Sequence, residues 1–325
     1  MVRRVLLVLL GAFLLMGGTQ ADAAEYPSKV ITIIVPFSAG GPSDTVARLL
    51  AQTMSGPLKT QVIVENVAGA GGTIGAARVA QAPPDGYTLF VHHIGHATAP
   101  ALYRKLTYNP ITDFEPIGII NDGAMTLVAR KDFPVKSFKE LIAYVKANKD
   151  KVNMANAGVG SASHLAGLLF MSEIETVLTT IPYKGTGPAM NDLLGGQVDF
   201  MIDQTTNTTS HIKAGKIKVY AVTTAQKLPS MPEVPTMKEA GLPKYQMTVW
   251  HALYAPKATP KPIVDKLSKA LQEALKDANL KQRYAELGAE VVAQDQATPE
   301  ALRAHLKAEI EKWGPIIKKA GVYAD

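Results

Sequence analysis

The stretch VPFSAGGPSD, Val35–Asp44, decides the fold. It follows the β-branched run KVITIIV, which is typical of a buried strand, and it precedes apolar residues at helical spacing from Val46 to Met54. Gly40 and Gly41 permit positive φ and a close approach to the backbone. Pro42 suits the first helical position, where its missing N–H is not needed. The stretch is therefore predicted to be a loop that joins a strand to a helix N-terminus.

A loop of this kind presents backbone N–H groups at the positive end of a helix dipole, which favours a bound anion. The alternative is an ordinary helix cap without a ligand, and the pattern alone does not decide between the two. If an anion binds, the N–H groups on offer are those of Ala39, Gly40, Gly41, Ser43 and Asp44, and Phe37 and Ser38 are also expected at the site.

The first residues have the pattern of a secretory signal peptide. Arg3 and Arg4 precede an apolar run, Val5–Met16, that is too short to span a membrane, and Ala21-Asp22-Ala23 fits the small-residue cleavage rule. We expect residues 1–23 to be removed near Ala23 and the mature protein to be exported to the periplasm. An uncleaved anchor is the alternative. The absence of cysteine in the sequence excludes disulfides, thiol catalysis and a lipidated N-terminal cysteine.

Charge indicates small anions rather than nucleic acid as partners. The 325 residues include 34 Lys and Arg and 28 Asp and Glu, and loss of residues 1–23 changes the net charge from +6 to +5. A mild positive charge attracts small anions. The lysines alternate with acidic residues along helical segments, as in EALKDANLKQRYAELGAE, and do not form the basic stripe of a nucleic-acid-binding protein.

Short β-branched runs alternate with amphipathic segments along the chain, which predicts an α/β protein with mostly parallel sheets. The second half repeats the order of strand, Gly/Ser loop and helix, beginning with a strand at Met125–Arg130. Two long helices are expected near Pro262–Ala278 and Pro299–Ala320. Because ligands of open α/β sheets bind at the carboxyl ends of strands, two such loops facing each other would clamp a ligand.

The second loop is AGVGSASHL, Ala157–Leu165. Glycines loosen its backbone, and its serines suit a helix N-cap or a hydrogen bond to a carboxylate. The expected site residues here are Gly158, Gly160, Ser161, Ser163 and His164. A nucleophilic serine is the rival interpretation, but the string lacks the G-x-S-x-G spacing of a nucleophile elbow and offers no acid to orient the histidine.

Three of the seven histidines, His92, His93 and His96, follow the predicted strand YTLFV. Zinc is one interpretation, because imidazole is a common zinc ligand, yet the sequence nominates no thiol or carboxylate to complete the site. Contact with an anion is favoured, because a neutral imidazole still donates one N–H.

Other strand ends add polar residues to the same edge. Tyr183 precedes a Gly-rich loop, and Asp203 ends the strand VDFMI; each is either a pocket residue or an ordinary surface or capping residue. The loop GAGGTIGAA, Gly69–Ala77, does not match G-x-G-x-x-G, because Ile74 stands where the third glycine belongs. We interpret it as a structural loop packed against the sheet.

Five long segments together resemble one known family. They are KVITIIVPFSAGGPSDTVARLLA, ENVAGAGGTIGAARVAQAPPDGYTL, MANAGVGSASHL, IPYKGTGPAMNDLLGGQVD and IKAGKIKVYAVTT. The chain resembles the extracytoplasmic solute receptors of tripartite tricarboxylate transporters, the Bug family, over essentially its whole mature length. The resemblance implies a type II-like, Venus-flytrap periplasmic-binding-protein fold with a hinge between two α/β domains. We expect residues 24–124 and 224–325 to form lobe 1 and residues 125–223 to form lobe 2.

The resemblance also implies a function. Receptors of this family bind carboxylates, with one carboxylate held by the first loop and the second loop closing from the other lobe. The ligand's other end would be read by His92, His93, His96, Tyr183, Asp203 and Thr206. A C4–C6 dicarboxylate and an aromatic dicarboxylate both remain open.

We expect a monomeric, non-enzymatic receptor without metal or cofactor that delivers its carboxylate to the membrane subunits of a transporter. A sensor subunit for a membrane kinase and a secreted serine hydrolase are the alternatives.

Overall fold

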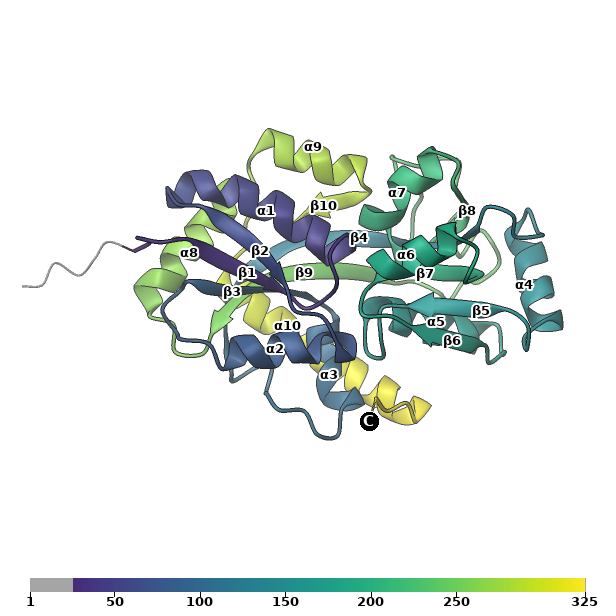
Figure 1. Ribbon diagram of the computed structural model, residues 1–325, viewed down its shortest axis with the longest axis horizontal. Helices are drawn as coiled ribbons and strands as arrows, with labels where there is room; N and C mark the ends of the chain where they lie inside the picture. The colour runs from purple at the N-terminus through teal and green to yellow at the C-terminus, as the bar shows by residue number, and fades with distance from the viewer. Residues whose placement is uncertain (1–25, 325) are drawn as a thin grey trace, which may run out of the picture.

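The computed structural model describes residues 26–324, so the predicted signal peptide lies outside the described residues. These residues form two α/β lobes (Figure 1). The chain builds most of the first lobe, crosses to the second, and returns to complete the first. This is the two-lobed architecture that the resemblance implies.

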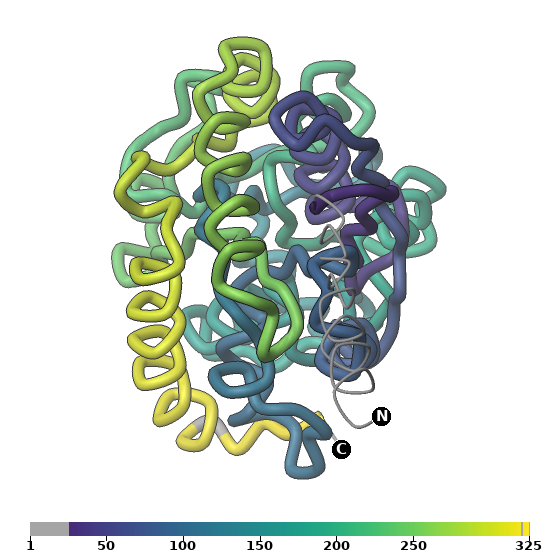
Figure 2. The backbone as a smooth tube through the Cα atoms, turned by 90° about the vertical axis from the view of Figure 1, so that its left-hand side faces the viewer, coloured from purple at the N-terminus to yellow at the C-terminus, as the bar shows by residue number. Residues whose placement is uncertain are grey.

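The first lobe has a sheet with helices on its faces. Its N-terminal elements are β1 (Ile31–Val35), α1 (Pro42–Leu58), β2 (Val62–Asn66), α2 (Thr73–Ala80), β3 (Thr88–His93) and α3 (Gly95–Leu102). A short 3-10 turn, Ala70–Gly72, precedes α2. Its C-terminal elements are α8 (Lys261–Ala274), α9 (Ala278–Glu286), β10 (Ala289–Val291) and α10 (Pro299–Ala320). The helix α10 runs along one side of this lobe (Figure 2).

The second lobe is smaller and is built from one continuous part of the chain. Its elements are α4 (Phe138–Ala147), β5 (Asn153–Asn156), α5 (Ala162–Glu173), β6 (Thr179–Pro182), α6 (Thr186–Leu194), β7 (Phe200–Gln204), α7 (Thr205–Lys213) and β8 (Ile217–Val222).

One long strand joins the two lobes. The strand β4 runs from Phe114 to Arg130, and its first half pairs with β9 (Thr248–Pro256) and β10, whereas its second half pairs with β7 and β8. Only the part of β4 from Met125 onward was predicted from the sequence. The lobe boundary expected between residues 124 and 125 therefore lies inside a continuous strand.

The return crossing is tied to β4 by Thr223, whose side chain is fully buried. Its hydroxyl accepts a hydrogen bond from the Met125 N–H at 3.0 Å and donates one to the Met247 carbonyl at 2.7 Å. The Thr223 N–H also donates to the Met125 carbonyl at 2.9 Å. The two crossings are thus held side by side by one residue.

The expectation of mostly parallel sheets was wrong. Parallel pairing joins β1 to β2 and β3, and β5 to β6 and β7. The other five pairings between strands in the described part of the chain are antiparallel. The reason is that every antiparallel pairing involves β4 or β9. These two strands lie in the centre of the sheet and run antiparallel to each other and to their other partners.

The helix expected at Pro262–Ala278 also ends earlier than predicted. The helix α8 stops at Ala274, and Asp277 begins α9 by accepting a hydrogen bond from the Leu280 N–H at 2.8 Å. Asp277 lies within the range predicted as one helix, and aspartate is a common N-capping residue, so Asp277 is the local signal for this break.

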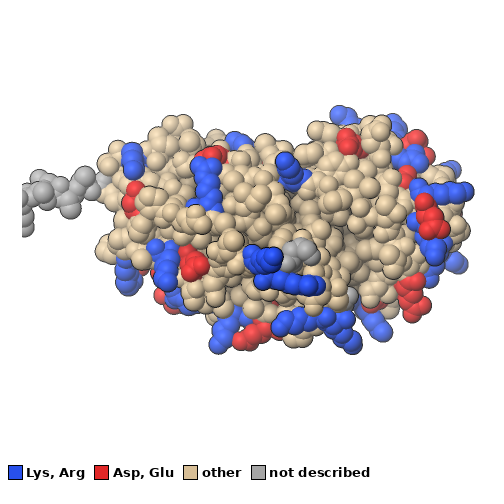
Figure 3. Space-filling view, turned by 60° about the horizontal axis from the view of Figure 1, so that its bottom comes forward, with Lys and Arg blue, Asp and Glu red and all other residues tan. Residues whose placement is uncertain are grey.

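Charged side chains are distributed over the surface as the sequence predicts, without a basic stripe on the face shown in Figure 3. On the face shown in Figure 3, basic and acidic side chains are interspersed and separated by uncharged surface. Within residues 26–324, we find no helix with the length and apolar character needed to cross a membrane.

One layer of the first lobe's core lies between its sheet and the buried face of α1. Leu50 is fully buried there, and the Tyr284 hydroxyl of α9 donates to the Val46 carbonyl of α1 at 2.9 Å. This packing holds the N-terminus of α1 at the carboxyl edge of β1, where the anion-binding loop was predicted.

We expect Leu50→Ala to lower the free energy of unfolding by about 2–5 kcal/mol, because it removes buried apolar atoms and leaves a cavity. Val177→Ala is the matched control, since Val177 is 84% exposed, and it should change stability by less than about 0.5 kcal/mol. Urea denaturation followed by circular dichroism measures both. Similar losses for the two variants would contradict this account of the core.

Candidate functional site

Helix N-termini and strand ends from both lobes meet around a small cavity. Its volume is about 20 Å³, which is room for roughly one water molecule. The first lobe contributes the start of α1 and the end of β3, and the second lobe contributes the starts of α5 and α6 and the end of β7. The lining residues are Phe37, Pro42, Ser43, His93, Ala157, Ser161, Ala162, Ser163, Thr186, Asp203 and Gln204.

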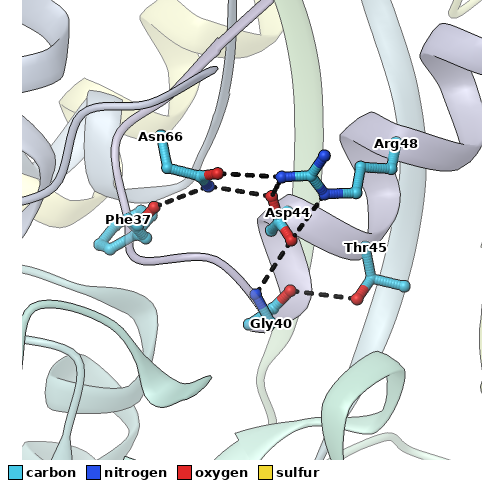
Figure 4. A network of polar contacts seen from close by, with 7 residues as sticks. Phe37, Gly40, Asp44, Thr45, Arg48 and Asn66 are labelled. Atoms are coloured by element: carbon cyan, nitrogen blue, oxygen red, sulfur yellow. Dashed lines mark hydrogen bonds and ion pairs between the residues drawn. The ribbon is translucent and has the colours of Figure 1, made fainter. Parts of the chain in front are cut away.

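Asp44 holds the first loop in shape rather than lining the cavity (Figure 4). Its carboxylate accepts the Gly40 N–H at 2.9 Å, the Asn66 amide at 2.9 Å and the Arg48 guanidinium at 3.0 Å. Burial alone would raise the pKa of Asp44, but these hydrogen bonds outweigh it and hold the pKa below its usual value. The Gly40 N–H, predicted to face an anion, is therefore already bonded within the loop.

Of the remaining N–H groups of this loop, one bonds to the other lobe and those at the start of α1 have no partner within the helix. The Ser38 N–H donates to the Lys184 carbonyl of the other lobe at 2.9 Å. The N–H groups in the first turn of α1, including that of Ser43, have no partner within a helix and lie at its positive end. Phe37 and Ser43 bring the loop to the cavity, while Ala39 and Gly41 lie against α6.

The second loop is ordered by its own serines and histidine. The Ser161 hydroxyl caps α5 by accepting the His164 N–H at 3.2 Å, and Ser163 accepts the Ala157 N–H at 2.8 Å. The His164 ring accepts the Gly160 N–H through Nδ1 at 3.3 Å. Ser161 thus contacts the backbone of His164 and not its ring. Ser161 and Ser163 line the cavity.

Of the three adjacent histidines, His93 is the one that lines the cavity. Its ring stacks on Phe37 at 4.9 Å, and its Nδ1 accepts the Gly95 N–H at 2.9 Å. Burial lowers the pKa of His93 to about 3, so the ring is neutral and keeps its hydrogen on Nε2. His93 therefore offers one N–H donor.

His92 and His96 lie behind His93 in an aromatic cluster. The His96 ring is 4.7 Å from Phe114 and 5.0 Å from Tyr254, and the His92 ring is 5.1 Å from Phe90. Both histidines are buried, and burial lowers the pKa of each. Among residues 26–324, no three His, Asp or Glu side chains are arranged to hold a metal ion.

Of the residues Tyr183, Asp203 and Thr206 that were predicted in the second lobe, only Asp203 lines the cavity. Asp203 lines the cavity, where it accepts the Asn207 amide at 2.6 Å. Tyr183 lines a separate cavity between the lobes, together with Ser38 and Gly158, and its hydroxyl donates to Asp192 at 2.6 Å. Thr206 is buried in the first turn of α7 and is not among the lining residues.

One buried group, which centres on His251 of β9, was not predicted from the sequence. The His251 Nε2 lies 3.1 Å from the Ser43 hydroxyl, and its Nδ1 lies 3.1 Å from the Asn121 amide oxygen. These residues come from α1, β9 and β4, and no local motif links them. The proximity of a serine, a neutral histidine and an amide could be found only from the fold.

Glycines let the two lobes touch backbone to backbone beside the cavity. A Cβ on Gly187 would lie 2.6 Å from the Ala39 carbonyl, and one on Gly185 would lie 2.9 Å from the Ser38 nitrogen. A Cβ on Gly71 would collide with the Val159 carbonyl of the other lobe. The loop around Gly71, interpreted from sequence as packed against the sheet, thus also forms part of the contact between the lobes.

Comparison with known proteins agrees with this geometry. Residues 46–322 match the model of the tripartite tricarboxylate transporter family receptor. The chain belongs to this receptor family. The structure of the periplasmic binding protein BugD is 52% identical, with a TM-score of 0.90, covering 92% of the receptor and 99% of that chain.

Two further structures of relatives contain carboxylates. MatC from Rhodopseudomonas palustris, solved with bound malate, is 42% identical to the receptor over 90% of its chain and 100% of the MatC chain, with a TM-score of 0.87. A second R. palustris protein, solved with adipate, is 33% identical over 92% of the receptor and 99% of that chain, with a TM-score of 0.86.

Asp203 gives the site a pH-dependent effect on stability. Burial raises the pKa of Asp203 to about 6, although the Asn207 hydrogen bond opposes this. The folded receptor therefore binds this proton more tightly than the unfolded chain, whose Asp pKa is near 4. Ionisation of Asp203 destabilises the fold progressively as pH rises from about 4 to about 6, and the full penalty is present above that range.

We expect Asp203→Asn to raise the free energy of unfolding at pH 7.5 by up to about 3 kcal/mol, and to raise it much less at pH 4.5. Urea denaturation at both pH values measures the difference. An equal effect at the two pH values would show that the ionisation of Asp203 is not the cause.

Proposed function

We propose that the receptor binds a small dicarboxylate in the cleft between its lobes in the periplasm and delivers it to the membrane subunits of a tripartite transporter. The observation that carries this proposal is the convergence of the α1, α5 and α6 N-termini, from opposite lobes, on one cavity. Partial positive charge at helix N-termini favours carboxylates from both sides. The malate and adipate found in relatives support the same ligand class.

The polar groups around the cavity suit carboxylate binding. His93 supplies an N–H, Ser161 and Ser163 supply hydroxyls, and the first turns of α1 and α5 supply backbone N–H groups. Of the predicted residues outside the lining, Gly40 and Asp44 would shape the first loop, and Gly158, Gly160 and His164 would shape the second.

We propose binding without catalysis. A serine hydrolase at the second loop would need a histidine ring that takes the proton of the serine hydroxyl. The His164 ring instead accepts a backbone N–H, and the hydroxyl of Ser161 accepts the His164 backbone N–H. Burial also lowers the pKa of His164 to about 4, which makes it a weak base.

We propose that the hinge lies at the two crossings, near residues 124–125 on β4 and residues 247–248 on the return, in a monomeric receptor. The residues just before the return still pack on the second lobe, where the Tyr245 hydroxyl donates to the Ala166 carbonyl at 2.8 Å. Thr223 ties these crossings together. A ligand that gains contacts from both lobes stabilises the closed form, which is the form the transporter would recognise.

Isothermal titration calorimetry tests the proposal on mature receptor, residues 24–325, that has been unfolded and refolded to remove bound ligand. The panel contains acetate, succinate, L-malate, adipate and phthalate. We expect at least one dicarboxylate to bind and acetate to bind much more weakly, because one carboxylate engages only part of the site. Folded, ligand-free receptor that binds none of these compounds would contradict the proposal.

Gly187→Ala should weaken binding of the best dicarboxylate by about tenfold or more. The added methyl group would meet the Ala39 carbonyl of the opposite lobe and so obstruct the contact between the lobes. Gly187 lies within α6, where alanine is favoured, so the fold of the second lobe should be preserved. Calorimetry should give a higher Kd than for the wild-type receptor, and small-angle X-ray scattering with ligand present should give a larger radius of gyration.

Gly314→Ala is the matched control, since it is also a helical glycine and a Cβ there meets nothing within 4 Å. It should leave the Kd unchanged. If Gly187→Ala binds and closes like the control, contact between the lobes does not contribute to affinity.

A further inference from the structure

One face of α7, in the second lobe, is directed at the end of α9 in the first lobe. It consists of Thr205, Thr209 and Lys213, which lie four residues apart along α7 and therefore on one side of the helix. Thr205 and Thr209 are buried, and Lys213 is exposed at the far end of α7. Each side chain carries a hydrogen-bond donor, and together the three residues form the α7 donor face.

The α7 donor face bonds three successive carbonyls at the C-terminal end of α9. The last carbonyls of a helix have no partner within the helix, and they lie at the negative end of its dipole. The acceptors are the carbonyls of Gly288 at 2.9 Å from the Thr205 hydroxyl, Leu287 at 3.3 Å from the Thr209 hydroxyl and Glu286 at 3.4 Å from the Lys213 ammonium group. The second lobe therefore caps a helix of the first lobe.

Gly288 is the residue that admits this contact. Its φ is +71°, in the left-handed region that glycine adopts without strain. A Cβ at Gly288 would lie 2.9 Å from the Cβ of Thr205. A side chain at this position would therefore push α7 away from the end of α9.

The two helices are each fixed to their own lobe. On α7, the Thr208 hydroxyl lies 2.7 Å from the hydroxyl of Thr126, which belongs to the half of β4 in the second lobe. On α9, the Tyr284 hydroxyl donates to the Val46 carbonyl of α1 in the first lobe. The bonds between the α7 donor face and α9 therefore cross from lobe to lobe, and they must change when the lobes move.

The contact lies on the side of the hinge where the cleft opens. Gln204, which precedes α7, and Ser43, in the first turn of α1, line the cavity from opposite lobes. The helix α9 packs against α1, and α7 lies beside both helices at the top of Figure 1. Separation of the lobes at the cavity thus also separates α7 from α9.

The three bonds lie at different distances from the hinge. Thr205 lies next to the crossing, since its hydroxyl is also 3.2 Å from the Ala124 carbonyl of β4. Lys213 lies about 12 Å further along α7, at a rise of 1.5 Å per residue. Rotation about the crossings displaces Thr209 and Lys213 more than Thr205, so their bonds to α9 are the ones that opening breaks.

We propose that the α7 donor face is a closure latch, whose bonds to α9 form when the lobes meet and set the affinity for the carboxylate without touching it. This inference rests on the proposed function. Thr209 and Lys213 are not among the residues that line the cavity, and they are positioning residues, since they act through the lobes. Because they stabilise the closed form whatever occupies the cleft, removing their bonds must weaken every ligand by the same factor.

Thr209→Val removes one bond of the latch and keeps the shape of the side chain. We expect the Kd of each dicarboxylate that binds in calorimetry to rise by the same factor, about threefold to tenfold, because the closed form loses one hydrogen bond. Thr209→Ser keeps the hydroxyl and should retain the wild-type Kd. An unchanged Kd in Thr209→Val, or a factor that differs among the ligands, would overturn the latch.

Ser210→Ala is the matched control for Thr209→Val. Ser210 is the next residue of α7, it is exposed, and it lies outside the α7 donor face. Loss of its hydroxyl should leave every Kd unchanged. A rise in Kd equal to that of Thr209→Val would attribute the effect to α7 in general and would overturn the assignment of Thr209.

A cross-link tests the latch without relying on carboxylate binding. The sequence has no cysteine, so Lys213→Cys and Glu286→Cys introduce two thiols at exposed positions, one in each lobe. A short bifunctional thiol reagent that joins them should hold α7 against α9. We expect cross-linking to lower the radius of gyration of the ligand-free receptor in small-angle X-ray scattering and to slow the exchange of bound dicarboxylate.

Gln282→Cys with Glu286→Cys is the control pair. Both positions lie on α9, where the Gln282 amide donates to the Glu286 carboxylate at 3.0 Å, so the same reagent joins one turn of one helix. This cross-link should change neither the radius of gyration nor the exchange.

The cross-link also separates failure of the latch from failure of the proposed function. If joining positions 213 and 286 changes nothing, α7 and α9 stay together in the open form and the latch is wrong. If no dicarboxylate binds but the cross-link lowers the radius of gyration, the latch stands as a device of closure and the proposed ligand class is wrong.

Discussion

The continuity of β4 across both lobes is the constraint on which the rest of the structure depends. Its first half belongs to the sheet of the first lobe and its second half to that of the second, and Thr223 ties the returning chain to its midpoint. A strand paired on both sides resists bending except where its partners change. We therefore expect any relative motion of the lobes to take place at this short region, so that the loops that face each other across the cleft meet in one register.

The site combines groups that favour an anion with groups that do not. Helix N-termini and the His93 N–H favour a carboxylate, and burial keeps the nearby histidines neutral, so the attraction comes from dipoles rather than from full charges. Asp203 opposes it, because a buried carboxylate beside a bound anion is unfavourable.

Local sequence patterns predicted the loops well, because glycine, proline and serine at a strand-to-helix junction have few structural uses. Five of the cavity residues were among the predicted site residues: Phe37, Ser161 and Ser163 from these loops, and His93 and Asp203 from polar side chains at strand ends. His251 and Asn121 could not be predicted, since they lie 130 residues apart and meet only through the pairing of β4 with β9.

The first half of β4 was missed because Pro116, Gly118 and Gly123 are typical of turns, and the strand accommodates them with shifts in its register. The contact between the lobes carries a further consequence. Backbone atoms meet at Gly71, Gly185 and Gly187, with no side chains between them that could be exchanged for longer or shorter ones. A side chain at any of these three positions would hold the lobes further apart. During divergence, we therefore expect these positions to stay glycine, so that adaptation to larger or smaller ligands falls to the residues that line the cavity.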